Sequence, residues 1–350
     1  MDPLKIDTVK LSDAGDALVI IDQTLLPNEV RYLSLTAIKD IWEAIRALRV
    51  RGAPAIGVAA AFGAYLAAYY APDAELEGRF LTACDYLATS RPTAVNLFWA
   101  LDRMRAAYGR VKALPPADIR AALRAEAQAV MDEDIEISRS IGRYGLSLLR
   151  PGMGILTHCN AGTLATAKYG TALAPVYAAI ERGLPGLRVY CDETRPLLQG
   201  ARLSAFEMVS AGVDTTLLCD NMASSLMKSG KVDIIFVGCD RVARNGDAAN
   251  KIGTSGVAIL AAHYGIPFYV CAPSSTIDGA IASGADIPIE FRPPEEVTEL
   301  WYEKRMAPEG VGVYNPAFDV TDAGLITGII TERGLVRAPY EEGFRALGLV

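Results

Sequence analysis

The chain has 350 residues, of which 51% are hydrophobic and 21% charged, enough for a large core or two domains. Its net charge is −7 and it has no basic run, which argues against a protein that coats nucleic acid. Six cysteines without a CxxC spacing, and only two histidines, argue against a structural zinc site. A disulfide framework is not expected in an apparently cytosolic chain of this size.

The mean hydropathy of +0.22 raises the question of a membrane span. The most apolar stretch is residues 53–70, mostly Ala and Gly with Pro54 near its start. We interpret it as a buried helix, because it lacks the basic flank of a signal peptide. The opening sequence, MDPLKIDTVKLSD, is charged and has no hydrophobic signal segment. We therefore expect a cytoplasmic protein without membrane contact.

The first part of the chain is expected to be mainly helical. Residues 17–35 contain two β-like runs around Leu26-Pro27-Asn28 and are interpreted as a hairpin. A helix capped by Thr36 is predicted over residues 37–50, where apolar side chains recur at helical spacing. The Ala-rich helix then starts near Pro54, and further helices are expected at about 73–90, 92–110 and 117–149.

After Arg150-Pro151-Gly152, short apolar runs alternate with helix-like segments, which predicts βαβ units and a parallel sheet. The helices are expected at 161–182, 198–211, 222–229 and 254–264. Five of these runs end near a cysteine that polar residues follow: Cys159, Cys191, Cys219, Cys239 and Cys271. In a parallel sheet the five ends line one edge, where open α/β folds bind ligands. The region from about residue 285 is expected to add a helix and a strand to this sheet.

We therefore predict an α/β protein with two domains. Residues 1–148 form a mainly helical N-terminal domain with a small β-hairpin element. Residues 149–350 form a Rossmann-like domain with a parallel sheet. Neither a G-x-G-x-x-G after a strand nor a G-x-x-x-x-G-K-[ST] is present, which counts against a dehydrogenase and an NTPase.

Two Gly-containing turns lie at predicted helix starts: Arg51-Gly52-Ala53, and the segment 159–172 with Gly162 and two threonines. A helix start offers free N–H groups and a partial positive charge, which suit a phosphate. Capping without any ligand is the more frequent reason for such a turn. Each motif alone is therefore a weak indication of phosphate binding.

Cys159 and Asp240 are the candidate catalytic groups. A helix expected after Cys159 would lower the pKa of its thiol, whereas His158 points to the other face of the strand and is expected to be a hydrogen-bonded structural residue. Asp240 follows an apolar run. Burial without a cation would raise its pKa and make it a proton donor, and contact with Arg241 or Lys251 would do the opposite. A turn or N-cap role for Asp240 also stays open.

Several motifs in this order closely resemble the methylthioribose-1-phosphate isomerase family of methionine salvage. They are RGAPAIG (51–57), SRPTAVNL (90–97), THCNAG (157–162), ETRP (193–196) with QGARL (199–203), GCDR (238–241), NGD (245–247), NKIGT (250–254) and NPAFD (315–319). The resemblance runs from about residue 15 to residue 338. Single motifs in this set are weak, whereas the ordered set is specific.

The resemblance implies a homodimer that converts 5-methylthioribose 1-phosphate to 5-methylthioribulose 1-phosphate, an aldose–ketose isomerisation within one molecule. It implies no metal and no organic cofactor. It assigns Cys159 to assisting the reaction at the sugar carbons and Asp240 to the role of acid. The substrate contacts it implies are Arg51, Gly52, Ala53, Arg91, Gln199, Asn250 and Lys251.

Three questions stay open on sequence alone. A sister isomerase for 5-deoxyribose 1-phosphate or ribose 1,5-bisphosphate would use the same core site, with Arg195, Arg202 or Arg244 available for a second phosphate. Non-enzymatic regulatory subunits of the initiation-factor exchange complex share the fold and are expected to lack the Cys159 and Asp240 pair. Hydrogen transfer between the sugar carbons can proceed as a proton through an enediolate or as a hydride.

Overall fold

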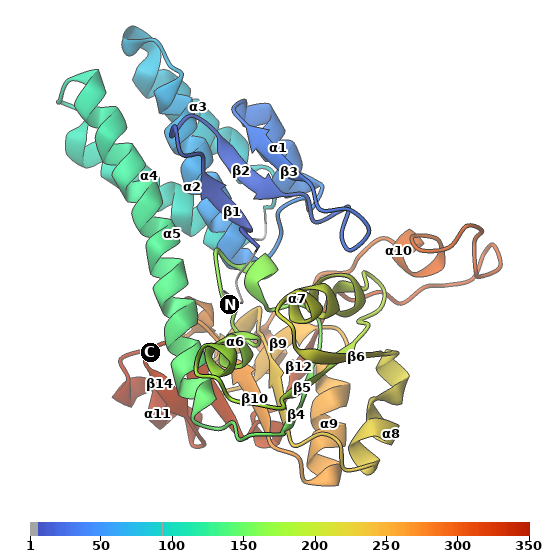
Figure 1. The fold of residues 1–350 in the computed structure, drawn as a ribbon. Helices are drawn as coiled ribbons and strands as arrows, with labels where there is room; N and C mark the ends of the chain where they lie inside the picture. The colour runs from blue at the N-terminus through green and yellow to red at the C-terminus, as the bar shows by residue number, and fades with distance from the viewer. Residues whose placement is uncertain (1–5, 93) are drawn as a thin grey trace. The chain divides into compact units, whose positions relative to one another are not determined.

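The computed structural model describes residues 6–92 and 94–350 (Figure 1). Residues 1–5 and Thr93, which belongs to the SRPTAVNL motif, lie outside the described residues. The chain forms two compact units. Of the described residues, the N-terminal unit contains 6–138 together with Gly162–Gly170, and the C-terminal unit contains Arg139–Ala161 and Thr171–Val350.

The N-terminal unit combines a small antiparallel sheet with a helical bundle. Its sheet has the order β1-β2-β3, and the β2–β3 pair is the predicted hairpin, with Leu18 opposite Leu35. The elements are β1 (Val9–Leu11), β2 (Leu18–Ile21), β3 (Tyr32–Leu35), α1 (Ile38–Arg46), α2 (Ala53–Tyr69), α3 (Leu76–Ala88), α4 (Val95–Val111) and α5 (Pro116–Leu146). The mainly helical character predicted from the sequence is confirmed.

Helix α2 is the core of the N-terminal unit. Its residues from Ala55 to Ala68 are all buried, and Pro54 occupies the first turn, where its missing N–H leaves no bond unmade. The predicted buried helix is therefore confirmed, and no helix within the described chain is long and apolar enough to cross a membrane. Helix α1 differs in detail from the prediction, because its N-cap is Ala37 and no described side chain caps it.

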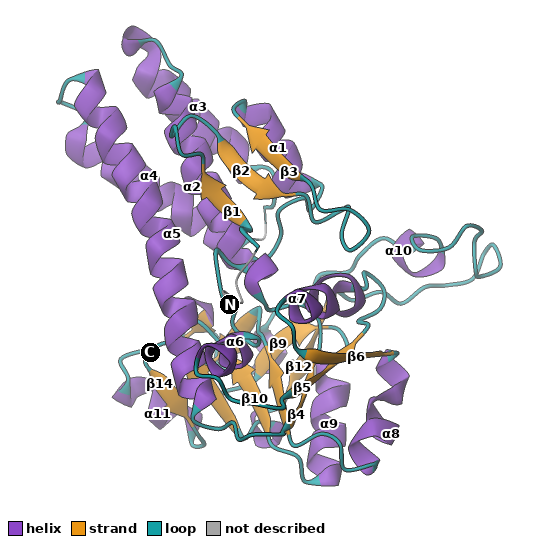
Figure 2. Ribbon diagram, in the orientation of Figure 1, coloured by secondary structure: helices purple, strands orange, loops and turns teal. Residues whose placement is uncertain are grey.

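The C-terminal unit is built on a seven-stranded sheet of order β14-β13-β10-β7-β4-β5-β6. Figure 2 shows the strands of this unit in orange. All pairs are parallel except β13–β14. The strands are β4 (Gly154–Thr157), β5 (Arg188–Asp192), β6 (Asp214–Leu218), β7 (Ile234–Val237), β10 (Phe268–Cys271), β13 (Gly328–Thr331) and β14 (Gly334–Val336). The predicted Rossmann-like sheet is thus confirmed.

Helices follow the strands and cover the sheet. Side chains of α8, α9 and α11 share one apolar cluster with alternate residues of the strands, among them Leu156, Ile235 and Val270. Burial on one face of a nearly continuous apolar strand is what βαβ connections produce. The helices of this unit are α6 (Ala174–Glu181), α7 (Ala205–Ser210), α8 (Ala223–Lys228), α9 (Thr254–Tyr264), α10 (Glu295–Thr298) and α11 (Tyr340–Ala346), together with the last turns of α5.

Two features of the chain after residue 150 differ from the prediction. Residues 161–173 are not helical apart from a single short turn at Thr163–Ala165, and α6 begins only at Ala174. A second sheet of order β11-β8-β9-β12 was not predicted; its strands are β8 (Arg241–Ala243), β9 (Ala248–Lys251), β11 (Ile277–Asp278) and β12 (Phe318–Thr321). These strands are very short, and β12 pairs with β9 from far along the chain, so local periodicity does not reveal them.

The two units divide inside α5, whereas the sequence places the domain boundary between residues 148 and 149. The loop-forming residues 150–152 mark the end of helix α5 in the sequence. They do not reveal that α5 passes from one unit to the other earlier, between Ser138 and Arg139. Residues 162–170 return to the N-terminal unit through contacts with residues far away in the sequence. The boundary at 148/149 stays a prediction about domains.

Candidate active site

The chain reverses its direction across the sheet between β4 and β7. The chain fills β4, β5 and β6 outward in one direction and then returns to place β7 on the other side of β4. In open α/β sheets the crevice beyond the carboxyl ends of two such strands is the usual ligand site. Cys159 follows β4 and Asp240 follows β7, so the two candidate catalytic residues flank this point.

A glycine allows the two strand ends to approach each other. A Cβ on Gly238, just after β7, would lie 2.6 Å from the Cβ of Ala161, which belongs to the loop of Cys159. No side chain fits at that distance, so the loop after β4 packs directly on the backbone after β7. The GCDR and THCNAG motifs are therefore in contact within one unit.

Cys159 has a left-handed backbone conformation with a φ of 66°. Such a conformation is strained for a residue with a Cβ and is stabilised here by hydrogen bonds to both backbone groups. The Cys159 N–H donates to Thr194 Oγ1 at 2.8 Å, and Ser204 Oγ donates to the Cys159 carbonyl at 2.7 Å. The thiol residue is 8% exposed. Because α6 begins only at Ala174, the expected helix dipole behind Cys159 is absent from the described chain, and that expectation is wrong.

A buried polar network supports this loop from behind. Asn160 Nδ2 donates to Ser204 Oγ at 3.1 Å and to Glu207 Oε1 at 2.9 Å, and the Tyr177 hydroxyl donates to Glu207 Oε2 at 3.0 Å. Buried polar groups cost stability unless they are bonded, so this arrangement specifies one geometry. The sequence shows none of these partners, because Cys159 and Ser204 are separated by β5 and the loop after it.

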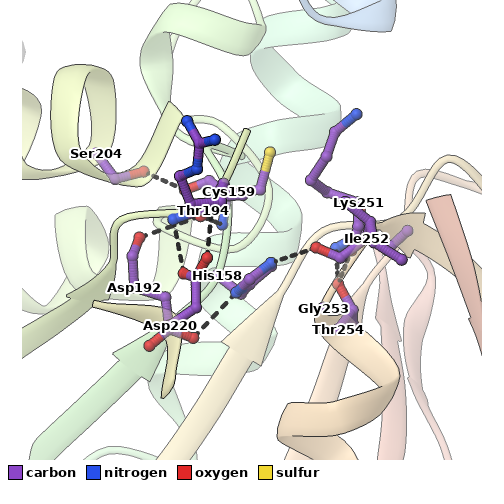
Figure 3. Close-up of polar contacts among 12 residues, drawn as sticks. His158, Cys159, Asp192, Thr194, Ser204, Asp220, Lys251, Ile252, Gly253 and Thr254 are labelled. Atoms are coloured by element: carbon purple, nitrogen blue, oxygen red, sulfur yellow. Dashed lines mark hydrogen bonds and ion pairs between the residues drawn. The ribbon is translucent and has the colours of Figure 1, made fainter. Parts of the chain in front are cut away.

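His158 lies behind Cys159 in a second buried network (Figure 3). Its Nδ1 is 3.0 Å from Asp192 Oδ2 and its Nε2 is 2.8 Å from the Ile252 carbonyl oxygen. The expected hydrogen-bonded structural role of His158 is confirmed. Asp220 is close to both side chains, and these three residues are a group in the described chain that could hold a metal ion. All three side chains already make hydrogen bonds within the protein. The two Asp220 oxygens accept the N–H groups of Thr194 and Arg195, each at 2.7 Å.

Asp240 is an exposed residue at the bend between β7 and β8. Its backbone N–H donates to the Ala249 carbonyl at 2.8 Å, which ties the bend to β9. It begins no helix, so the N-cap interpretation is wrong. The protein alone does not bury this carboxyl group, and the arginine next to it, Arg241, bonds to Asp278 at 3.2 Å.

Three predicted substrate contacts lie in the same unit as Cys159 and Asp240. Asn250 and Lys251 are on β9 rather than in a loop, and Asn250 Nδ2 donates to Thr254 Oγ1 at 3.0 Å. The Lys251 ammonium group lies 4.4 Å from the centroid of the Phe318 ring. Gln199 is 6% exposed, and its Oε1 has no hydrogen-bond partner among the described residues. In Figure 3 the Cys159 sulfur and the Lys251 side chain both point away from the His158 network.

The other predicted contacts lie in the N-terminal unit, where Arg51 and Arg91 precede the neighbouring helices α2 and α4. A Cβ on Gly57 in α2 would be 3.0 Å from the Asn96 carbonyl oxygen, so the first turns of these helices touch. Both arginines are half-buried. Two arginines that come shortly before two helix N-termini have suitable chemistry for binding a phosphate.

Gly52 and Ala53 form the turn into α2. The turn is fixed by residues 162–170: a Cβ on Gly52 would lie 2.3 Å from the Ala165 carbonyl oxygen, and Gln23 Nε2 donates to the Leu164 carbonyl at 2.8 Å. Gly52 also has a φ of 91°. The segment that follows the Cys159 loop in the sequence therefore supports the predicted phosphate turn.

We expect Gly52→Ala to destabilise the protein by about 2–5 kcal/mol, from backbone strain at positive φ together with overpacking against Ala165. Urea unfolding followed by circular dichroism measures this loss. Gly78→Ala in α3 is the matched control. No described atom lies within 4 Å of the Cβ position there, so it should gain roughly 0.5–1 kcal/mol of helix propensity. Equal effects of the two substitutions would contradict the role of the close approach.

We expect Asp134 on α5 to make the stability of the N-terminal unit depend on pH. Burial raises the pKa of Asp134 to about 7, against the lowering effect of the Ala167 N–H, which donates to Oδ2 at 2.6 Å. Because the pKa in the folded state is raised, the stabilisation is complete below the ordinary value of 3.8 and is lost as the pH rises through about 7.

At pH 8 the expected cost is up to roughly 4 kcal/mol relative to pH 4. Asp134→Asn keeps an acceptor for Ala167 and should flatten the dependence of the melting temperature on pH between 5 and 8. Asp132→Asn, at an exposed position on the same helix, serves as the control and should leave the slope unchanged. Parallel curves for wild type and Asp134→Asn would refute the assignment.

The arginines considered for a second phosphate have structural contacts. The Arg195 guanidinium donates to the Val297 carbonyl at 2.7 Å and lies over the Tyr302 ring. Arg202 lies 4.7 Å from the Trp301 ring centroid, and Arg244 pairs with Glu341 at 3.5 Å. Because these three guanidinium groups already contact other groups of the protein, the structure does not favour a substrate with a second phosphate, such as ribose 1,5-bisphosphate.

Comparisons with known proteins agree with this fold and these motifs. Residues 49–338 match the model of the initiation factor 2 subunit family. The chain is 66% identical over 348 residues to a methylthioribose-1-phosphate isomerase of Symbiobacterium thermophilum, covering 99% of this chain and 97% of the relative. It is 57% identical to a 5-deoxyribose 1-phosphate isomerase of Petrotoga mobilis, covering 97% and 98%.

A solved structure agrees over the whole chain. The crystal structure of 5-methylthioribose 1-phosphate isomerase from Pyrococcus horikoshii superposes with a TM-score of 0.94 at 44% identity, covering 99% of this chain and 97% of that one. The match at the level of sequence and of fold extends across both units. The chain therefore belongs to the initiation factor 2 subunit family, and the relatives named above carry the names of sugar-phosphate isomerases.

Proposed function

We propose that this protein is an aldose–ketose isomerase that converts 5-methylthioribose 1-phosphate to 5-methylthioribulose 1-phosphate in methionine salvage. The observation that carries the proposal is the placement of a thiol and a carboxyl group, Cys159 and Asp240, on either side of the point where the sheet order reverses. The names of the relatives at 66% and 44% identity support the choice of substrate. Regulatory subunits of this family are expected to lack that pair, so its presence favours an enzyme.

The reaction explains why these groups are needed. The phosphate on C1 blocks opening of the sugar to a free aldehyde, so an acid must protonate the ring oxygen, and we assign this to Asp240. Since Asp240 is exposed in the chain alone, the bound sugar itself must exclude water from the carboxyl group. Hydrogen then moves from C2 to C1, either as a proton that Cys159 takes from C2 and returns to C1, or as a hydride while Cys159 polarises the C2 hydroxyl group. In both routes the C2 hydroxyl group loses its proton as the ketone forms, which balances the proton given to the ring oxygen.

The remaining predicted contacts have suitable chemistry for a phosphorylated sugar. Arg51 and Arg91 supply guanidinium groups, and Gly52 and Ala53 a helix start, for the phosphate. The Oε1 atom of Gln199 is buried and has no partner among the described residues, so it suits a sugar hydroxyl. Asn250 and Lys251 offer an amide and an ammonium group on β9.

5-Deoxyribose 1-phosphate is a second candidate substrate, because a relative at 57% identity is named a 5-deoxyribose 1-phosphate isomerase. The test is turnover of 5-methylthioribose 1-phosphate, 5-deoxyribose 1-phosphate and ribose 1,5-bisphosphate by the purified protein. We expect the highest kcat/KM for the methylthio sugar and the lowest for the bisphosphate. No turnover of any of them would refute the isomerase proposal.

The same assay run in heavy water separates the two routes of hydrogen transfer. Deuterium from the solvent in the product supports proton abstraction by Cys159. Its absence leaves the hydride shift and a shielded proton as the alternatives. In either case no metal or organic cofactor is part of the proposed reaction.

We also propose a homodimer. Large apolar side chains are exposed at the edge of the main sheet formed by β6: Val209 on α7, Leu217 on β6 and Met222 after it are at least half exposed. An uncovered edge strand with apolar neighbours is a surface that proteins usually cover. Sedimentation of wild type and Leu217→Lys tests this, and a monomeric wild type at micromolar concentration would exclude it.

A further inference from the structure

His158 and Asp192 are fully buried next to Cys159, and the proposed reaction assigns them no role. The contacts of the imidazole ring determine its protons. A carbonyl oxygen can only accept, so the Nε2 atom at 2.8 Å from the Ile252 oxygen must carry a hydrogen. The 3.0 Å contact between Nδ1 and Asp192 Oδ2 requires one more proton between those two atoms.

The pair therefore shares one proton, and Nε2 is a donor whichever atom holds it. Burial opposes charge on the ring, but the hydrogen bond and the negative charge of Asp192 outweigh it and raise the pKa of His158. Asp220, which also faces the ring, acts in the same direction. Burial raises the pKa of the Asp192 carboxyl group as well. Nε2 is a donor whether the shared proton lies on Nδ1 or on Asp192.

The Nε2 contact fixes the backbone that follows Lys251. Gly253 has a φ of 102°, and a Cβ there would lie 2.8 Å from His158 Cε1, so the ring packs directly on this turn. Asp319 Oδ2 accepts the Gly253 N–H at 2.8 Å from another direction. The residues that precede the turn, Asn250 and Lys251, are predicted substrate contacts. Figure 3 shows Lys251 beside Ile252 and Gly253.

The other side of the pair is connected to Cys159. Thr194 Oγ1 donates to the Asp192 carbonyl at 3.1 Å and accepts the Cys159 N–H at 2.8 Å. Asp192 thus holds the ring through its side chain and the Cys159 loop through its backbone. One compact network joins the end of β4, the end of β5 and the end of β9.

We propose that His158 is a positioning residue for the isomerisation, which sets the place of Lys251 relative to Cys159 by donating its Nε2–H to the Ile252 carbonyl. Asp192 keeps the ring in the required orientation. The inference rests on the proposed function for its effect on turnover. The geometry of the ring is independent of that function and is tested separately.

Three substitutions separate the contacts of the pair. Asp192→Asn keeps both, because its amide can donate to Nδ1 while Nε2–H still reaches Ile252. His158→Asn keeps a donor near Asp192 and loses the Ile252 contact. His158→Gln combined with Asp192→Asn restores a donor at the position of Nε2 without leaving a buried unpaired carboxylate.

We expect kcat/KM for the methylthio sugar to fall roughly tenfold or more in His158→Asn, the equivalent of one buried carbonyl left without a partner. Asp192→Asn should stay close to wild type, and the double variant should recover most of the loss. Melting temperatures report any general loss of fold. Equal losses in His158→Asn and Asp192→Asn, or unchanged kcat/KM in His158→Asn, would overturn the positioning role.

Nitrogen NMR of the histidine rings tests the geometry without any assay of turnover. The chain has only two histidines, and His263 is exposed, so His263→Gln assigns both sets of signals. The His158 ring should show hydrogen on Nε2 both in wild type and in Asp192→Asn. A His158 Nε2 without hydrogen overturns the inference even if the enzyme is active. Correct ring signals without turnover of any sugar phosphate refute the proposed function instead.

Discussion

Cys159→Ser is expected to lower kcat by about 10²–10⁴-fold and to leave the protein folded. The hydroxyl group is a much weaker acid than the thiol, so it is poorly suited to take a proton from C2 or to polarise the sugar hydroxyl. The fold should persist because the strained backbone at this position is held by Thr194 and Ser204 through main-chain atoms. Initial rates with 5-methylthioribose 1-phosphate, together with the melting temperature, measure both effects.

Cys219→Ser is the matched control for the thiol. Cys219 is exposed and has no role in the proposed reaction. Like Cys159, it lies beyond the carboxyl end of a strand of the main sheet, in this case β6. It should keep wild-type kcat. A near wild-type rate for Cys159→Ser would remove the thiol from the mechanism, and a large loss of melting temperature would show that the sulfur supports the fold instead.

Asp240→Asn is expected to lower kcat by a similar factor of about 10²–10⁴, because an amide cannot donate a proton to the ring oxygen as the sugar opens. The loss should appear in kcat more than in KM, since the proton is transferred only in the transition state. The backbone N–H of residue 240 still reaches the Ala249 carbonyl, so the bend between β7 and β8 should stay intact. The pH profile of kcat gives a second measurement, in which the limb that reports the acid should vanish in Asp240→Asn.

Asp214→Asn provides the control for the carboxyl group. Asp214 is exposed at the amino end of β6, the opposite edge of the same sheet, so its replacement should change neither kcat nor its pH profile. If Asp240→Asn retains the wild-type rate and pH profile, another group must be the acid. The exposed position of Asp240 has a consequence for other substrates. A sugar without the methylthio group should shield the Asp240 carboxyl group from water less completely, and we expect its turnover to be slower.

Much of the fold follows from local features of the sequence. The apolar runs at 155–156, 234–237 and 268–270 are short, bounded by polar residues and separated by helical segments, so a parallel sheet is the arrangement that buries them. The same pattern places Cys159 and Asp240 directly after strands. Their catalytic roles came from the ordered motifs and stay predictions until they are measured.

Where local pattern was the only guide, the prediction was wrong in instructive places. Residues 161–173 contain helix-forming residues, but the segment gives up helical hydrogen bonds for contacts with Thr8, Gln23 and Asp134 in the N-terminal unit. Asn250 and Lys251 look like loop residues and lie on a strand, because β9 pairs with β12 from about seventy residues further along. Partners so distant in the chain leave no periodic signal near either residue.

The sequence alone determined that this protein has a helical part, a parallel α/β part and a thiol and a carboxyl group after two of its strands. Only the tertiary structure decided that β7 returns beside β4 and that Thr194 and Ser204 hold Cys159 in its left-handed conformation. It also decided that His158 donates to the turn after Lys251. The first set depends on interactions between near neighbours in the chain, whereas the second depends on which distant segments pack together, and that choice is made by the whole core at once.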